Sequence, residues 1–324
     1  MSIFISKNFV FFGVFPLVFC IAFSFVASMS AQNCGSSFDL KKLRQSNSPE
    51  YREYLRLEDI TTAYRQRMTA NPNARLIDEN GTITIPVVFH VLHRGVSSVS
   101  NIPAAEITEQ LAILNACYSQ TNDQSAIHST FLALAGNPNL KFELACIDPN
   151  GNATTGILRK QTSTVNFVSQ DDNAKSSNMG GDDPWPTDRY LNVWITPNLN
   201  SRDVDGAFTF LYPVYGNSSF PRDFVNHPQK DGVVVVYNCI GINSNNPDYR
   251  GQGMALVHEI AHWLNLRHLF DDGCSNDDGC ADTKPQDAPT KASVSCPVFP
   301  LKPNKCGANS NPNGDMYENF MLYQ

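Results

Sequence analysis

The pattern of hydrophobic and polar positions divides the chain into three parts. An apolar run at 9–26 is followed, at 32–80, by a charged segment with apolar residues at helical spacing. From residue 81 onward, short β-branched runs alternate with amphipathic helical patterns, which is typical of an α/β domain. The sequence therefore predicts a leader at 1–31, a separate segment at 32–80 and a folded domain at 81–324.

Apolar runs of strand length mark the body of this domain. The predicted strands are Ile83–Leu92, Leu140–Ile147, Tyr190–Thr196, Ala207–Tyr212 and Val233–Tyr237. A helix is predicted at Pro103–Tyr118, because its apolar residues share one stripe and a proline opens it. Residues 148–187 are rich in Gly, Asn, Ser and Asp, so we expect loops with short elements there.

The apolar run at 9–26 has the layout of a secretory signal peptide. Lys7 precedes it, and the small residues Ala27–Ala31 follow it, as a signal peptidase requires. A transmembrane anchor is the alternative interpretation of the same run. We therefore expect a secreted protein with no membrane anchor after removal of the signal. The segment 32–80 that follows is interpreted as a pro-segment, with an ordinary helical arm as the alternative.

Composition and charge exclude some classes of protein. Hydrophobic residues make up 42% of the chain and charged residues 17%, too apolar a balance for an intrinsically disordered chain. The net charge is −7 and no dense basic run is present, so nucleic acid is not an expected partner. Eight of the nine cysteines lie beyond the leader, and export would allow them to form disulfides.

The most informative stretch is HEIAHWLNLRH, which begins at His258. His258 and His262 are four residues apart on a predicted helix that begins near 251–253, so both imidazoles face the same way. Two neutral imidazoles at this spacing can bind one Zn²⁺ ion and leave room for a third ligand and a water. Glu259 can reach that water but not readily the ion, which is the position of a general base. Alone, this pattern also occurs by chance as surface charge on helices.

The third ligand must come from outside the helix. His268 can supply it if the helix stops, because another His on the same helix would lie a turn away from the ion. Asn265 follows His262 by three residues, and Asn readily adopts the left-handed conformation that ends helices. We therefore expect His258, His262 and His268 to bind zinc.

These residues resemble the metzincin metallopeptidases, in which a glycine turn precedes the third His and a turn that contains Met follows later. Asn265 stands where Gly is usual. Within the metzincins, the sequence resembles the pappalysin family and its secreted bacterial members. The matching stretches are Val257–Leu264, His268–Phe270, Gly273-Cys274, Asp282-Thr283 and Asn319–Tyr323. The last resembles the Met-turn, with Leu322 where Asp is more common.

The resemblance covers about residues 83–324 and implies a fold and further site residues. The implied fold is a metzincin-like catalytic domain of mixed α/β (α+β) class. It has a twisted, mostly parallel sheet, an active-site helix and an irregular carboxy-terminal subdomain. Met321 would form the apolar floor beneath the zinc ion. Tyr323 would project its hydroxyl toward the substrate carbonyl and stabilise the developing oxyanion.

The implied activity is that of a secreted zinc endopeptidase made as a zymogen. Water at the metal would lose its proton to Glu259, which later returns the proton to the leaving amine. No Gly-x-Ser-x-Gly elbow accompanies a suitable triad, which argues against covalent serine peptidases. Proteins or peptides are the expected substrates, and we expect a monomer.

The loop after His268 is acidic and irregular, a setting that suits Ca²⁺. The resemblance implies calcium binding in this region, with Asp278, Asp282 and Thr283 as the matching positions. A solvated acidic loop without an ion is the alternative.

Several cysteines are assigned by the resemblance. Cys34 could bind the zinc ion and keep the zymogen inactive, or it could form a structural disulfide. The resemblance favours a disulfide between Cys274 and Cys306 and leaves Cys296 without its usual partner, although Cys280 could substitute. Family members continue past the Met-turn with a helix and another cysteine, so the domain is expected to be truncated after it.

Two other functions compete with the peptidase. One is a catalytically impaired, metal-stabilised binding protein of the same fold, which an incomplete substrate cleft would favour. The presence of Glu259 argues against it, because a purely structural metal site has no use for a base. The other is a zinc hydrolase of small esters or amides, which the three-His layout disfavours.

Overall fold

The structure is a computed structural model of the full chain. It describes residues 81–205, 208–213, 216–218, 227–242, 252–270, 282–286, 299–301 and 313–322, with scattered positions in 51–66 and 274–306. Cys34, Cys296 and Tyr323 lie outside the described residues. The predicted boundaries near residues 31 and 80 also fall outside them, so they remain predictions.

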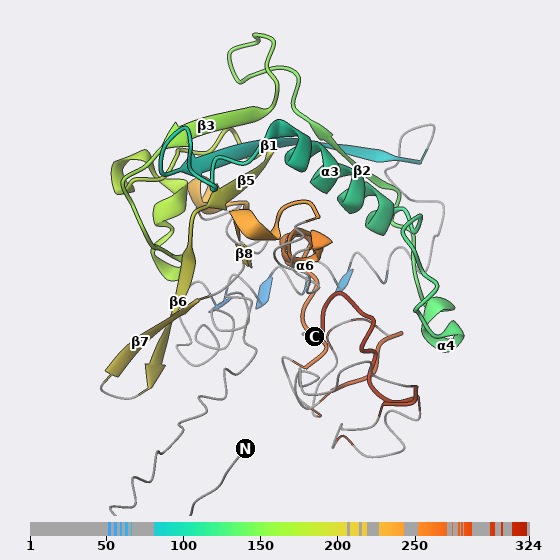
Figure 1. The fold of residues 1–324 in the computed structure, drawn as a ribbon. Coiled ribbons are helices and arrows are strands. Elements are labelled where there is room, and N and C mark those ends of the chain that lie inside the picture. The colour runs from blue at the N-terminus through green and yellow to red at the C-terminus, as the bar shows by residue number, and fades with distance from the viewer. Residues whose placement is uncertain are drawn as a thin grey trace, which may run out of the picture. The chain divides into compact units, whose positions relative to one another are not determined.

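A mostly parallel sheet forms the centre of the domain (Figure 1). Its strands are β1 (Ile83–His93), β2 (Leu140–Leu144), β3 (Ile157–Gln161), β5 (Leu191–Thr196), β8 (Gly216–Ser218) and β9 (Val233–Val236). The order is β2-β1-β5-β9-β8, and β3 also pairs with β1. Every described pair in this sheet is parallel except β8 with β9. The mixed α/β fold with a mostly parallel sheet is therefore confirmed.

Strand β1 lies at the heart of the sheet because both of its faces are apolar, as expected for a parallel sheet covered on both sides. Its first half pairs with β2, its second half with β3, and β5 lies along its other edge. Val87, Phe89 and Val91 point to one face and are fully buried against the helices. His90 and Leu92 alternate with them and are buried on the other face.

Two helices pack on the first face. They are α3 (Ala104–Tyr118), which opens after Pro103 as predicted, and α6 (Met254–Trp263) (Figure 1). Ile107 and Leu114 of α3 join the same core cluster as Leu256 and Ile260 of α6. Burial of each such side chain contributes about 1.5–3 kcal/mol, so this cluster fixes α6 against the sheet.

Short elements cover the second face of the sheet. Phe167 of β4 (Phe167–Val168), Ala174 of η2 (Asn173–Lys175) and Leu199 of β6 (Leu199–Asp205) pack against it. The short helices η1 (Ser169–Asp171) and η3 (Ser177–Met179) flank η2 along the chain. The remaining short elements are α4 (Ser129–Leu132), β7 (Phe208–Pro213), η4 (Pro228–Lys230) and η5 (Tyr237–Cys239). Strands β4, β6 and β7 form a second sheet. The prediction of loops with short elements at 148–187 is confirmed.

The segment that carries η1, η2 and η3 is attached to the sheet through Asp182, which follows them in the chain. Its carboxylate lies 2.8 Å from Nδ1 of His90 and 3.1 Å from Nζ of Lys160, and its carbonyl accepts a hydrogen bond from Trp194. Burial raises the pKa of Asp182, but His90 and Lys160 outweigh this effect and hold it below its ordinary value. The carboxylate is therefore stabilised as an anion in the folded protein.

Most predicted strands are confirmed, with small shifts of their ends. β2 ends at Leu144, and Ile147 instead forms an isolated bridge with Ala153. In the described part of the chain, no helix is long and apolar enough to cross a membrane.

Candidate metal centre

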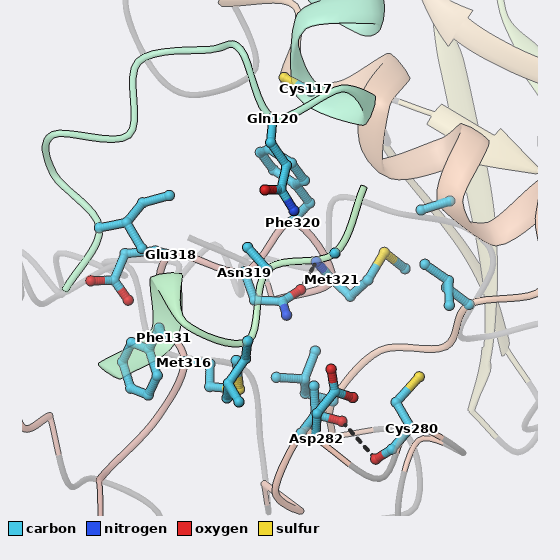
Figure 2. Close-up of a pocket in the computed structure, with 18 of the residues that line it drawn as sticks. Cys117, Gln120, Phe131, Cys280, Asp282, Met316, Glu318, Asn319, Phe320 and Met321 are labelled. Atoms are coloured by element: carbon cyan, nitrogen blue, oxygen red, sulfur yellow. Dashed lines mark hydrogen bonds between the residues drawn. The ribbon is translucent and has the colours of Figure 1, made fainter. Parts of the chain in front are cut away.

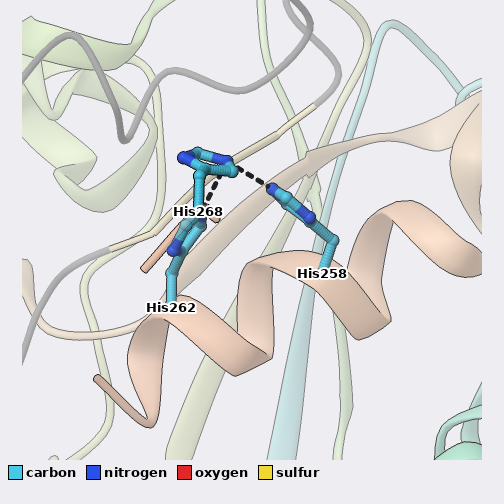
Figure 3. A group of neighbouring side chains, drawn as sticks. All are labelled: His258, His262 and His268. Carbon is cyan, nitrogen blue, oxygen red and sulfur yellow. Dashed lines mark hydrogen bonds between the residues drawn. The ribbon is translucent and has the colours of Figure 1, made fainter. Parts of the chain in front are cut away.

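Three imidazoles from one short stretch of chain meet at a point (Figure 3). Nε2 of His268 lies 3.0 Å from Nε2 of His258 and 3.1 Å from Nε2 of His262. His258 and His262 lie one turn apart on α6, and His268 follows the helix. The exposed fractions of the three residues are 6%, 0% and 0%, in order along the chain. The sequence prediction that these side chains converge agrees with this geometry.

The end of α6 explains how His268 reaches the other two rings. Asn265 has a left-handed backbone, with φ of 72°. Its N–H donates to the carbonyl of His262, and the N–H of Leu266 donates to the carbonyl of Ala261. These two bonds define a Schellman motif, which ends a helix and reverses the chain. Asn265 therefore occupies the left-handed position that Gly takes in most such turns.

Backbone carbonyls fix the proton positions on two of the rings. Nδ1 of His258 lies 2.5 Å from the carbonyl oxygen of Phe320, and Nδ1 of His262 lies 2.8 Å from that of Leu266. A carbonyl only accepts, so each Nδ1 must carry the proton and donate it. In the neutral rings, each Nε2 then presents a lone pair toward the shared point.

This arrangement fits a cation. A proton on Nε2 of His268 could be donated to only one of the two facing lone pairs, whereas a metal ion can satisfy all three. Tetrahedral zinc with Zn–N bonds of about 2.0–2.1 Å separates its nitrogen ligands by about 3.3 Å, close to the observed spacing. Within the described residues, this is the one group of His, Cys, Asp or Glu side chains with metal-binding geometry.

Burial also keeps the site ready for a metal. It lowers the pKa of His262 well below its ordinary value, and the rings of His268 and His258 lower it further by repulsion. The ring is therefore neutral at neutral pH, as a metal ligand must be. Glu259 follows His258 directly and is only 2% exposed. It is the buried carboxylate of the same helix.

The turn that contains Met321 packs beside the helix end. Met321 is 5% exposed and belongs to an apolar cluster with Ala261 and Leu269. Its carbonyl accepts a hydrogen bond from the N–H of Leu269, one residue after His268. The adjacent Phe320 carbonyl accepts from His258, so this turn is bonded to the segments that carry the first and third imidazoles. The apolar role predicted for Met321 is consistent with this packing.

Two supporting residues were not anticipated from the sequence. Gln110 of α3 is fully buried; its Nε2 donates to the carbonyl of Gly253, which precedes α6, and its Oε1 accepts from the N–H of Gly241. Asp231 accepts a hydrogen bond from the indole of Trp263, at the other end of α6. A signal for Gln110 was present, because it is a polar residue on the apolar stripe of its helix. Asp231 carried no comparable signal.

The acidic loop after the third imidazole is partly described. Thr283 donates from its hydroxyl to both carboxylate oxygens of Asp278, at 2.6 and 2.7 Å, and the N–H of Cys280 donates to the same carboxylate. Asp282 is exposed. Cys274 and Cys306, the pair that the resemblance favoured, form a disulfide.

A cavity of about 510 Å³ lies beside the Met321 turn (Figure 2). Phe131, Met316, Phe320 and Met321 give it an apolar lining, and Gln120 extends into it. None of the three imidazoles lines it, so it is separate from the metal centre.

Comparison with known proteins gives a consistent picture. Residues 173–324 match a peptidase family M43 model described as pregnancy-associated plasma protein-A. An extracellular metalloprotease of Arthroderma benhamiae is 26% identical over 264 residues, which cover 78% of this chain and 74% of that protein. An extracellular metalloprotease of Neurospora crassa is 25% identical over 267 residues, which cover 82% and 75%.

Proteins of solved structure share more sequence identity with this chain than these fungal relatives do. A promirolysin mutant of Tannerella forsythia is 37% identical with a TM-score of 0.72, covering 90% of this chain and 87% of that one. Mature mirolysin of Tannerella forsythia in complex with a cleaved peptide is 39% identical with a TM-score of 0.64, covering 75% and 84%. A mirolysin complex with a small compound is 40% identical, with the same TM-score and coverage.

Proposed function

The chain belongs to the pappalysin family of metzincin zinc metallopeptidases, and from this premise we propose that it is a secreted endopeptidase whose catalytic zinc ion is bound by His258, His262 and His268. The observation that carries the proposal is that Nε2 of His268 lies 3.0 Å from Nε2 of His258 and 3.1 Å from Nε2 of His262. Buried, neutral imidazoles with lone pairs directed at one point form a donor set that suits zinc.

Glu259 is the proposed general base. When bound, zinc supplies Lewis-acid chemistry, making water acidic near neutral pH and polarising the peptide carbonyl. The carboxylate of Glu259 takes the proton from the attacking water and later passes it to the leaving amine. Its place on α6, directly after His258, and its burial beside that imidazole support this role.

Met321 and Tyr323 are proposed to complete the site. Met321 forms the apolar floor that keeps the imidazoles in place, which its packing against Ala261 and Leu269 supports. Tyr323, two residues later in the sequence, is proposed to donate its hydroxyl to the developing oxyanion. Protein or peptide substrates follow from the peptidase family.

We further propose that the protein is exported and made as a zymogen. Curated relatives are named extracellular metalloproteases. The promirolysin mutant covers 90% of this chain and mature mirolysin covers 75%; the difference, about 49 residues, equals the length of 32–80. This supports a leader at 1–31, a pro-segment at 32–80 and a catalytic domain at 81–324. Cys34 is the proposed latency residue of that pro-segment.

Calcium is proposed to bind near Asp278, Asp282 and Thr283. The two oxygen-bearing side chains of Asp278 and Thr283 already lie within hydrogen-bond distance of each other. Carboxylate and hydroxyl oxygens on an irregular loop are ligands that Ca²⁺ accepts. A rise in melting temperature on addition of calcium, absent in the Asp278→Asn variant, would support the site.

The peptidase proposal is tested by casein digestion with the secreted, processed protein. Wild type is expected to cleave casein, to carry one zinc ion per chain by elemental analysis, and to lose activity with a zinc chelator. Glu259→Gln keeps the size of the side chain and is expected to retain zinc but to lower kcat by about 10²–10⁴-fold. Processed wild type that binds zinc without cleaving would favour a binding protein of the same fold.

A further inference from the structure

We propose that Asp231 is a positioning residue for the metal centre, acting on α6 through the indole of Trp263. Nε1 of Trp263 donates a hydrogen bond to Oδ1 of Asp231 at 3.1 Å. Trp263 is the last residue of α6 and directly follows His262. The inference rests on the proposed role of His262 as a zinc ligand. Asp231 lies outside the group of three imidazoles, so its effect on the metal is indirect.

The backbone around Asp231 is constrained, and this fixes the position from which its carboxylate extends. Asp231 is 2% exposed and ends the short helix η4, where its N–H donates to the carbonyl of Pro228. The next residue is Gly232, with φ of 130°. A Cβ at Gly232 would lie 2.4 Å from the carbonyl oxygen of Asn192 on β5. The backbone after Asp231 therefore lies so close to the central sheet that it cannot shift toward it.

The residue before Asp231 is anchored by a partly buried charge cluster. Nζ of Lys230 lies 3.1 Å from Asp172, and the carbonyl of Lys230 accepts a hydrogen bond from Lys175. Lys175 also lies 3.2 Å from Asp172. Burial raises the pKa of Asp172, but the two ammonium groups outweigh this effect and lower it, so the carboxylate stays ionised. Asp231 is thus fixed on both sides and serves as a rigid acceptor.

The end of α6 is where such an anchor matters most. Helix ends fray more readily than helix interiors. The last turn here carries His262, whose Nδ1 donates to the carbonyl of Leu266 in the turn that leads to His268. A rotation of the last helical turn at Trp263 would displace the imidazoles of His262 and His268. The bond from Trp263 to Asp231 therefore holds two of the three proposed zinc ligands in register without touching the ion.

The test compares variants that remove the bond with variants that do not. Asp231→Ala removes the acceptor, Trp263→Phe removes the donor and keeps a smaller aromatic ring, and Asp231→Asn keeps an oxygen acceptor. Tyr190→Phe is the matched control, because it deletes another aromatic hydrogen bond, from Tyr190 to the carbonyl of Ile147, away from α6. For each secreted, processed protein, the zinc Kd is measured by competition with a chromophoric chelator. The kcat and KM are measured on a fluorogenic peptide.

Asp231→Ala and Trp263→Phe are each expected to weaken zinc binding about tenfold, the lower end of the effect seen for residues that orient metal ligands. Both variants should lower kcat and leave KM within about twofold of wild type. The double variant should bind zinc no more weakly than either single variant, because both substitutions remove the same hydrogen bond. Asp231→Asn should restore most of the affinity, and Tyr190→Phe should not change it.

Equal zinc affinity in wild type and Trp263→Phe would overturn the inference, as would an equal loss in Tyr190→Phe. Trp263→Phe keeps the test decisive if Asp231→Ala does not fold. A wild-type protein that binds no zinc would instead refute the proposed function, and the inference with it.

Discussion

Replacing Asn265 isolates the energetic cost of the turn that brings His268 to the other imidazoles. Its φ of 72° lies in the left-handed region, which costs an ordinary residue with a Cβ about 1–2 kcal/mol. Asn pays less than Ala there, because it adopts this region more readily. We therefore expect Asn265→Ala to lower the free energy of unfolding by about 1 kcal/mol. Asn265→Gly should be nearly neutral, because relief at the turn offsets the greater freedom of Gly in the unfolded chain.

The measurement is urea unfolding of the protein in excess chelator, so that metal binding does not contribute. With a slope of about 2.5 kcal/mol per M, a loss of about 1 kcal/mol moves the midpoint down by about 0.4 M. Asn265→Gly should stay within about 0.2 M of wild type, and Asn265→Val should fall further than Asn265→Ala because its branched side chain tolerates this backbone least. If Gly destabilises as much as Ala, the Asn side chain and not the backbone conformation is what matters, and the reasoning is wrong.

Three other predictions follow from the packing, the charges and the disulfide. Gly232→Ala should lower the free energy of unfolding by about 1–3 kcal/mol, measured in urea, because the new Cβ would overlap the carbonyl of Asn192; an unchanged midpoint would show that the backbone moves freely there. Asp182 has a folded pKa below its ordinary 3.8, so its contribution to stability is present above that value and lost as the pH falls through the folded pKa. Unfolding at pH 5 and pH 3 should therefore differ less in Asp182→Asn than in wild type, and an equal difference would contradict the assignment. Loss of the disulfide in Cys274→Ser with Cys306→Ser should cost about 3–4 kcal/mol for a loop of 32 residues, and a calorimetric change below about 1 kcal/mol would argue against that closure.

The sequence was sufficient to predict that the three imidazoles converge, because their geometry is local. His258 and His262 need only one turn of helix, and Asn265 supplies the reversal for His268 within three residues. The interior strands were predictable for the same reason, since runs such as Val233–Val236 are apolar on both faces.

What supports the site could not be predicted in this way. The Phe320 carbonyl that orients His258 lies 62 residues away along the chain, and a backbone atom has no signature in the sequence. Asp231 reads as an ordinary loop carboxylate until the fold brings Trp263 beside it. Strand β3 was expected only as part of a loop-rich region, because its alternation of burial is weak and its pairing with β1 is non-local. Long-range pairing rather than local preference decides these features.

The hydrogen bond from His258 to Phe320 also links the orientation of the His258 ring to the order in which the chain is synthesised. A ribosome makes the helix with its first two imidazoles about sixty residues before it makes the carbonyl that sets the first of them. An unfinished chain therefore lacks a correctly oriented His258, however well its earlier parts have folded. The orientation of this imidazole is therefore complete only after the chain has been made through Phe320.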